Sequence, residues 1–328
     1  RYFRKIKSKI KKFLIMKNIA ILGVTGYIGK SLLNEFSEEK KGKYKLFLFS
    51  RSKDKVKSFI KDIKIKSDYD IHSMEEFDSF HYDVIINSTG ISDPIILKKH
   101  PSNIFKVTEE IDDFIISYLK KNTKTLYINF SSGVVYGDNF AESKNIDTKS
   151  IVNINSLNVS EYYTVAKINA EAKHRSLSDL NIVKLRVFSF CSRFIDTSVG
   201  FLMSEAMDCI KNDKVLVTME SNIIRDYNVS KDLFNLVELV IKKVKVNDFF
   251  DVYSKKPIAK FDLLDFLKKN YGLKYIIKKT PKLVRKSILT SKNYYFAKTK
   301  KAKELGYKPE FTSLQGLKFE IDQIIKSK

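Results

Sequence analysis

A glycine-rich segment near the amino terminus has the spacing of a phosphate-binding turn. Three glycines stand where the short apolar run 18–24 ends and a segment with helical spacing begins. Glycines at such a place let the backbone turn tightly and approach a pyrophosphate, which then lies at the amino terminus of the next helix. We therefore expect a dinucleotide to bind here, at Gly23, Thr25, Gly26, Tyr27, Ile28 and Gly29.

The end of the second predicted strand indicates which dinucleotide binds. An NAD site of this kind usually has an acidic residue there, which accepts a hydrogen bond from the ribose 2′-hydroxyl. This chain has Ser50 followed by Arg51. A carboxylate would repel a 2′-phosphate, whereas a guanidinium can form two hydrogen bonds with it. Ser50 and Arg51 therefore favour NADP(H). The alternative is NAD(H), in which case Arg51 is an ordinary surface cation.

The elements that must position these residues alternate regularly along the first half of the chain. Apolar runs without polar alternation predict buried strands, and amphipathic segments predict helices. We expect strands at residues 18–24, 43–50, 82–90, 125–132 and 181–190. We expect helices at residues 30–39, 54–63, 109–122 and 163–177. This order predicts an α/β fold with a Rossmann-type, doubly wound parallel sheet.

Beyond the last of these strands the alternation becomes less regular, which predicts a smaller α/β domain that binds the substrate. We expect a basic extension at 1–15, a dinucleotide-binding domain at 16–188 with about 224–252 returning to it, and a substrate-binding domain at about 189–223 and 253–328. The extension has seven positive charges and no acid. A segment upstream of the folded domain is the plainer interpretation, and a basic amphipathic helix on a membrane surface is the other.

The net charge of the chain is +23, from 61 basic and 38 acidic residues. Only eight of the basic residues are Arg, the residue that most often contacts bases and phosphates. This composition favours a solvated lysine surface, and we expect no nucleic-acid partner. No apolar run reaches 18 residues, so no membrane-spanning helix is expected. Two cysteines, Cys191 and Cys209, cannot form a disulfide framework, and a cytoplasmic location fits best.

The four histidines show no metal-ligand spacing. We therefore expect no metal site, and we expect these residues at the surface: His72, His81, His100 and His174.

Five segments, in order along the chain, resemble the extended short-chain dehydrogenase/reductase family. The similarity is greatest to its nucleotide-sugar epimerases, dehydratases and reductases. The segments are the glycine turn at 23–29, SSGVVYG at 131–137, YTVAK at 163–167, RDYNVSKD at 225–232 and KAKELGYKP at 301–309. The resemblance covers about residues 17–320, nearly the whole chain.

A tyrosine four residues before a lysine is not informative by itself in this chain. About two or three such pairs are expected by chance, and four occur: Tyr163/Lys167, Tyr227/Lys231, Tyr275/Lys279 and Tyr294/Lys298. Only Tyr163 follows the predicted strand that ends in Ser131 and Ser132 and precedes another strand. That order places Ser132, Tyr163 and Lys167 at the carboxyl edge of the sheet, where ligands bind in such folds.

The resemblance implies a role for each of these three residues. Tyr163 would exchange a proton with a sugar oxygen while a hydride moves to or from the nicotinamide. Lys167, one helical turn away, would stabilise the phenolate form of Tyr163 and bind the nicotinamide ribose. Ser132 would hold the substrate oxygen by a hydrogen bond.

The resemblance also assigns residues outside this group. Asn87, Thr89 and Gly90 match the segment beside the cofactor, and Asp68 and Asp70 are weaker candidates for contacts with adenine. Ser131, Ser189 and Arg225 match substrate positions. Arg225 would bind the nucleotide diphosphate, and its alternative is an ion pair with Asp226 or Asp232.

Three departures from the family pattern concern the substrate. The family's 4,6-dehydratases have an Asp-Glu pair where this chain has Gly133 and Val134, which disfavours dehydration. The family's RxxN segment has Ser189 in place of its Asn, and its RDYxHV segment has Asn228 in place of its His. Substrate geometry therefore differs from the usual pattern.

Together these observations predict an NADP(H)-dependent nucleotide-sugar oxidoreductase, most simply a 4-ketoreductase that makes a surface-polysaccharide sugar. A net reductase consumes NADPH, so the preference for a reductase depends on Arg51, which favours NADP(H). An epimerase with tightly bound NAD is the alternative within the family, and a non-catalytic NAD(P)- or RNA-binding protein on the same fold is the alternative of another class. The expected partner is a nucleotide-diphosphate sugar. The helix at 109–122 would either form a homodimer face or pack on the sheet.

Overall fold

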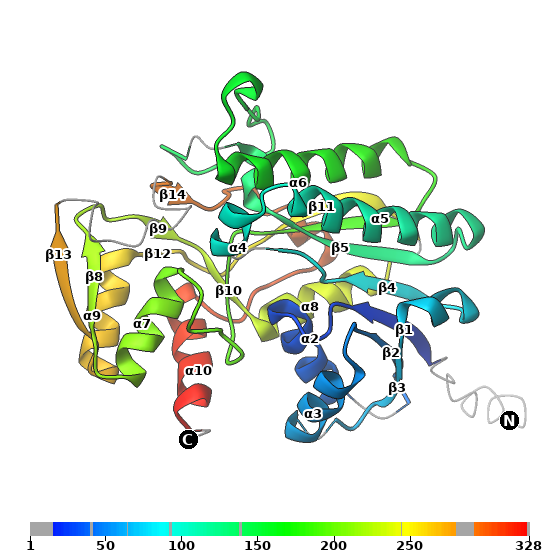
Figure 1. The fold of residues 1–328 in the computed structure, drawn as a ribbon, viewed down its shortest axis with the longest axis horizontal. Coiled ribbons are helices and arrows are strands. Elements are labelled where there is room, and N and C mark those ends of the chain that lie inside the picture. Colours follow the sequence, from blue (N-terminus) through cyan, green and yellow to red (C-terminus); the bar gives the residue numbers. More distant parts are fainter. Residues whose placement is uncertain are drawn as a thin grey trace, which may run out of the picture.

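A computed structural model describes residues 16–39, 42–63, 65–91, 94–137, 140–243, 245–279 and 292–326. The predicted basic extension at 1–15 lies outside the described residues. Figure 1 shows a central sheet with helices on both faces and a group of smaller elements at one end of the molecule. Among the described residues, no helix is both long and apolar enough to cross a membrane.

The centre of the fold is a parallel sheet of seven strands. They are β1 (Lys17–Leu22), β2 (Tyr44–Phe49), β3 (Asp68–His72), β4 (Val84–Asn87), β5 (Leu126–Ser132), β6 (Ile182–Val187) and β11 (Asn247–Val252). Their spatial order is β11-β6-β5-β4-β1-β2-β3, and all neighbours are parallel. The order in which strands are added reverses between β1 and β4: β2 and β3 lie on one side of β1, and β4, β5 and β6 follow on the other. Such a switch point is where these sheets bind ligands. The predicted Rossmann-type, doubly wound sheet is confirmed.

Both faces of the sheet are apolar because helices cover both. Ile19 and Ile21 point to the face that is covered by α2 (Tyr27–Ser37), α3 (Lys53–Ile63) and α8 (Ser230–Ile241). Ala20 and Leu22 point to the opposite face, which carries α5 (Asn103–Lys121). There α5 packs against α6 (Val159–Ser176), and the short α4 (Pro94–Lys99) contacts α6. This two-sided burial explains why the strands lack polar alternation.

The later part of the chain forms small sheets and a third apolar core. Its strands are β7 (Ser189–Cys191), β8 (Val215–Met219), β9 (Ile224–Arg225), β10 (Tyr227–Val229), β12 (Ile258–Ala259), β13 (Lys274–Lys278) and β14 (Tyr294–Tyr295). Its helices are α7 (Leu202–Lys211), α9 (Lys260–Tyr271) and α10 (Ser313–Lys326), which share the core around Leu264 and Leu317. The exact division into domains stays a prediction.

Short 3₁₀ helices complete the described elements. They are η1 (Met74–Ser79), η2 (Gly133–Tyr136), η3 (Ile154–Ser156) and η5 (Lys301–Leu305). The second of these directly follows β5 and forms the turn that contains the predicted serine motif.

Candidate active site

The glycine turn lies at the carboxyl end of β1, where β4 lies beside it. Gly23 has a φ of 75°, and a Cβ at this residue would lie 2.8 Å from the amide nitrogen of Thr89. A Cβ at Gly29 would overlap the carbonyl oxygen of Gly23. The amide of Gly26, the N-cap of α2, donates to that same oxygen at 2.8 Å. Only glycine fits the first and last positions, so the motif has a backbone reason.

The other predicted cofactor residues occupy the same edge of the sheet. Thr25 lies in the turn, and Tyr27 and Ile28 begin α2. Ser50 directly follows β2, and its hydroxyl accepts a hydrogen bond from the amide of Ser52 at 3.2 Å. The side chain of Arg51 is exposed. The end of β2 therefore offers an accessible cation.

A polar segment follows β4 and lies against Gly23. The buried Asn87 accepts a hydrogen bond from the amide of Thr89 at 3.0 Å through its Oδ1 atom. The amide of Ser88 donates to the carbonyl of Leu22 at 3.0 Å, so the segment is tied to the end of β1. Gly90 is exposed beyond it. Residues 87–90, which we call the cofactor wall, therefore lie against the glycine turn at the carboxyl edge of the sheet, where the cofactor crevice is expected.

The side chains of Tyr163 and Lys167 lie on one face of α6, four residues apart. The ammonium of Lys167 is 5.6 Å from the centre of the Tyr163 ring and donates to the carbonyl of Phe130 at 3.0 Å. Lys167 is buried, whereas Tyr163 is half-buried. The lysine is thus fixed to β5 at the residue before the two serines, with its charge close to the tyrosine.

Ser132 ends β5 and begins the η2 turn. Its hydroxyl oxygen is 3.1 Å from the hydroxyl oxygen of Tyr295, which belongs to β14. Tyr163 packs against the apolar cluster that contains Tyr295 and Phe188. The structure therefore brings the serine and the tyrosine to one cluster of side chains, together with a residue that the sequence motifs do not include.

Tyr295 reaches this place from the far end of the chain. It is 1 % exposed, and its ring lies 5.2 Å from that of Phe188. The guanidinium of Arg225 is 5.6 Å from the same ring, and the ammonium of Lys292 is 5.3 Å from it. The sequence contains no signal that could have identified Tyr295, because its contacts depend on the pairing of β14 with β9.

Ser131 points to a different partner from Ser132. Its hydroxyl donates to the carboxylate of Glu171 at 2.6 Å, and this carboxylate also accepts three hydrogen bonds from Arg186, the shortest at 2.5 Å. All three side chains are buried. Ser131 thus fastens β5 to α6 in this structure, and its predicted contact with substrate stays a prediction.

The two predicted substrate residues in the later part of the chain lie on neighbouring elements. Ser189 begins β7 and is half-buried. Arg225 is buried in β9 and donates to the carbonyl of Lys292 at 2.6 Å. The two acids expected as alternative ion-pair partners of Arg225 accept hydrogen bonds from other residues. Asp226 accepts from the amide of Ser254, and Asp232 accepts from that of Glu310.

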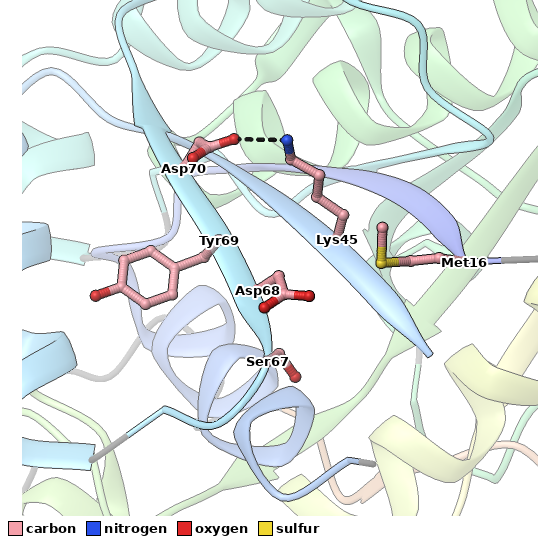
Figure 2. A pocket seen from close by; sticks show the side chains of 6 residues that line it. All are labelled: Met16, Lys45, Ser67, Asp68, Tyr69 and Asp70. Atoms are coloured by element: carbon pink, nitrogen blue, oxygen red, sulfur yellow. Dashed lines mark ion pairs between the residues drawn. The ribbon is translucent and has the colours of Figure 1, made fainter. Parts of the chain in front are cut away.

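The position of Asp68 excludes its predicted contact with adenine. Asp68 begins β3 and therefore lies at the amino edge of the parallel sheet, whereas the glycine turn is at the carboxyl edge. Figure 2 shows Asp68 beside Asp70, which forms an ion pair with Lys45 at 3.0 Å. These residues line an open hollow of about 490 Å³. That hollow is at the opposite edge of the sheet from the glycine turn.

The predicted surface position of His174 is wrong. His174 is 1 % exposed, and its Nε2 atom is 2.6 Å from a carboxylate oxygen of Asp112, which is also buried. The carboxylate offsets the loss of water around the imidazole, which is why a polar ring can remain inside the fold. Nothing in the sequence spacing links these residues, which belong to α6 and α5.

Comparison with known proteins agrees with this geometry. Residues 19–253 match the family model described as the NAD dependent epimerase/dehydratase family. A stretch of 157 residues is 32% identical to the bifunctional polymyxin resistance protein ArnA of Wigglesworthia glossinidia brevipalpis. That match covers 45% of this chain and about a quarter, 24%, of the relative's length.

Solved structures with the same fold cover nearly the whole chain. A UDP-glucuronic acid 4-epimerase variant from Bacillus cereus superposes with a TM-score of 0.77 at 17% identity, over 95% of this chain and 100% of that one. The ADP-L-glycero-D-manno-heptose-6-epimerase of Helicobacter pylori gives 0.74 at 18% identity, over 96% and 98%. The motif order, the sheet and the family match agree, and the chain belongs to the NAD dependent epimerase/dehydratase family.

Proposed function

We propose that this protein is an NADP(H)-dependent nucleotide-sugar oxidoreductase, a 4-ketoreductase, with Tyr163 as its general acid. The observation that carries the cofactor preference is the end of β2, where the accessible Arg51 follows Ser50 and no acid occurs before α3. A guanidinium at this position favours a 2′-phosphate, and a carboxylate would oppose it. NADPH is the reduced pool that a net ketoreductase consumes.

The residues at the carboxyl edge divide the chemistry between them. The cofactor supplies the hydride when it is bound. Tyr163 gives its phenolic proton to the oxygen of the sugar carbonyl as that oxygen becomes a hydroxyl. Lys167, held by the carbonyl of Phe130, stabilises the phenolate that remains. Ser132 donates a hydrogen bond to the same substrate oxygen and keeps it within reach of Tyr163.

The serine turn supports reduction or epimerisation over dehydration. A Cβ at Gly133 would overlap the ring of Phe188. An aspartate side chain at this position would need that ring to move away from its packing against Tyr136 and Tyr295. The aspartate of the Asp-Glu pair in the family's dehydratases therefore has no room at Gly133.

A group of buried cations supports an anionic substrate such as a nucleotide diphosphate. Arg225 and Lys292 both lie against the ring of Tyr295. Lys260 follows β12, the strand that pairs with the strand of Arg225. Burial and the charge of Arg225 lower the pKa of Lys260 to about 8. An anion bound near these residues would relieve the mutual repulsion of Lys260 and Arg225. Several of the solved structures with this fold contain UDP-sugars.

The test is a fluorescence titration of the purified protein with NADPH and with NADH. We expect NADPH to bind at least about tenfold more tightly, and Arg51→Ala to remove the difference. Lys61→Ala, which removes an exposed cation from α3, is the matched control and should keep it. Oxidation of NADPH with a panel of keto-sugar nucleotides then identifies the substrate.

Two other results would overturn this proposal. Preference for NAD(H), or NAD already bound after purification, would support an epimerase that recovers its hydride in each turnover. Failure to bind either dinucleotide would leave the site without a cofactor. Salt-dependent retention of RNA would then become the next measurement.

A further inference from the structure

A chain of buried polar side chains lies directly behind the cofactor wall. The hydroxyl of Tyr127, the second residue of β5, donates to the carboxylate of Asp112 on α5 at 2.9 Å. The same hydroxyl oxygen accepts from the side-chain amide of Asn87 at 3.0 Å and from that of Asn129 at 2.7 Å. Tyr127 is 0 % exposed. One phenol thus joins a buried acid to the residue that begins the cofactor wall.

The chemistry of these groups fixes the direction of every hydrogen bond. An ionised carboxylate can only accept, so Tyr127 must give its single proton to Asp112. The oxygen of Tyr127 then has only lone pairs to offer, and Asn87 must present its NH₂ group to it. The carbonyl oxygen of Asn87 therefore points the other way, where it accepts from the amide of Thr89 at 3.0 Å. The acid on α5 sets the orientation of Asn87.

The ionised state of Asp112 is stabilised by His174 and Lys173 on α6 and by Lys184 on β6. Burial opposes ionisation, but the hydrogen bond from His174 and the nearby charges of Lys184 and Lys173 outweigh it and keep the pKa of Asp112 well below its usual range. Burial lowers the pKa of His174, whose Nε2 atom lies 2.6 Å from a carboxylate oxygen of Asp112. The ammonium of Lys173 is 2.7 Å from the other carboxylate oxygen.

The second amide at the phenol obeys the same rule. Asn129 gives its NH₂ group to Tyr127, and its carbonyl oxygen accepts from the ammonium of Lys184 at 3.0 Å. Burial lowers the pKa of Lys184 to about 7. Each amide is thus oriented by a hydrogen-bond partner on either side, and the hydroxyl oxygen of Tyr127 is the atom that the two amides share.

The position of the wall matters because it almost touches the glycine turn. A Cβ at Gly23 would lie 2.8 Å from the amide nitrogen of Thr89. A shift of a few tenths of an ångström in residues 88–90 would therefore change the space between the wall and the turn. A misoriented Asn87 would release Thr89 from its acceptor and permit that shift.

We propose that Tyr127, whose hydroxyl is oriented by its hydrogen bond to Asp112, is a positioning residue for the dinucleotide, which acts by holding Asn87 and Thr89 against the glycine turn. The proposal rests on the proposed function, because it assumes that the crevice binds NAD(P). It assigns to β5 a role in cofactor affinity that is separate from its serine motif. Tyr127 itself touches no ligand in this proposal.

The experiment compares Tyr127→Phe with Tyr82→Phe by dinucleotide titration and thermal unfolding. Tyr82 is the matched control: it is also 0 % exposed and in the same core, and its hydroxyl donates to the carbonyl of Phe77 at 2.7 Å, away from the wall. We expect both variants to lose some stability. Only Tyr127→Phe should weaken dinucleotide binding, by at least about fivefold, and raise KM for the dinucleotide more than it lowers kcat.

A double-variant cycle decides whether Tyr127 acts through Asn87. In an Asn87→Ala background, Tyr127→Phe should weaken binding by less than about twofold, because the link is already absent. Asp112→Asn, which keeps the size but removes the charge, should weaken binding in the wild-type background as Tyr127→Phe does. Equal affinities for Tyr127→Phe and Tyr82→Phe, or additive losses with Asn87→Ala, would overturn the inference. If the wild-type protein binds neither dinucleotide, the proposed function fails first.

Discussion

Replacement of Tyr163 should slow the chemical step and leave dinucleotide binding almost unchanged. The Tyr163→Phe change removes one hydroxyl and keeps the half-buried ring against its apolar neighbours. Without a proton donor, we expect kcat to fall by about 10²–10⁴ while dinucleotide affinity stays within twofold. Steady-state assay with the substrate found in the panel, together with the fluorescence titration, measures both.

Tyr162→Phe is the control for this prediction. Tyr162 lies next to Tyr163 on α6, and its ring contacts that of Phe105 rather than the Ser132 cluster. The loss of the Tyr162 hydroxyl in this variant should leave kcat nearly unchanged. Retention of more than a tenth of the activity in Tyr163→Phe would exclude this residue as the general acid.

The packing around Gly133 limits which acidic side chains the serine turn can hold, and therefore which reaction the site can catalyse. The ring of Phe188 fills the space that a Cβ would need. We expect Gly133→Ala to lower the free energy of unfolding by about 1–3 kcal/mol, as overpacking does in other cores. Gly200→Ala should have little effect through packing, because the nearest atom to a Cβ there is 3.9 Å away. Urea denaturation of both variants tests this.

A second substitution shows whether the cost at Gly133 comes from the Phe188 ring. In a Phe188→Leu background, Gly133→Ala should cost much less, since the smaller side chain leaves room for the methyl group. Should Gly133→Ala be as stable as Gly200→Ala in the wild-type background, the steric argument against the dehydratase acid pair would lose its basis.

At the scale of elements, the serine turn η2 is fastened to the edge strand β11. The hydroxyl of Tyr136 donates to Asp251 at 2.8 Å. Burial raises the pKa of Asp251 to about 6, against the opposing charge of Arg186. An unfolded aspartate has a pKa near 3.9, so between about pH 4 and 6 the folded protein binds one more proton here. The stability from this group is full below pH 4 and is lost as pH rises through 6.

Asp251→Asn should therefore change how stability depends on pH. The difference in unfolding free energy between wild type and Asp251→Asn should move against the wild type by roughly 1 kcal/mol between pH 5 and 7.5. Urea denaturation at several pH values measures it. Asp262→Asn, an exposed position in the first turn of α9, provides the control for the loss of a surface carboxylate. A flat curve for Asp251→Asn would show that the carboxyl does not titrate in this range.

The sequence predicts those elements that are apolar and local, and it fails where partners are distant. The expected strand at 125–132 and helix at 54–63 differ from β5 and α3 by one residue at an end. The strand β3 was not predicted, because Asp68 and Asp70 make its first residues polar. Pairing with β2 stabilises β3 as a strand, although its composition does not indicate one.

The candidate site shows the same division. The glycine turn and the Tyr163–Lys167 pair are local patterns, so their positions on a turn and on a helix could be predicted. The contact of Ser132 with Tyr295 spans 163 residues, and that of Asp112 with His174 spans 62. Such contacts depend on which strands and helices become neighbours. Composition and spacing do not contain that information.

At the scale of the whole molecule, the cofactor crevice and the later part of the chain are joined through Tyr27. The hydroxyl of Tyr27, in the first turn of α2, accepts from the amide of Ser192 at 2.7 Å. Ser31, one turn further along, donates to the hydroxyl of Ser192 at 2.9 Å. Ser192 directly follows β7, which begins at the predicted substrate residue Ser189. The helix that would receive the pyrophosphate thus holds a segment of the substrate side.

This link predicts that the dinucleotide stabilises residues 189–192 without touching them. Binding at the glycine turn should slow hydrogen exchange of the amides in this segment, and Tyr27→Phe should remove most of that effect while exchange at 23–29 is still slowed. Tyr44→Phe is the control: it removes a hydroxyl of a buried tyrosine that donates to Glu238 rather than to residues 189–192. Hydrogen–deuterium exchange with and without dinucleotide measures all three proteins. Equal slowing at 189–192 in wild type and Tyr27→Phe would mean that the two parts communicate by another route, or that cofactor binding orders them independently.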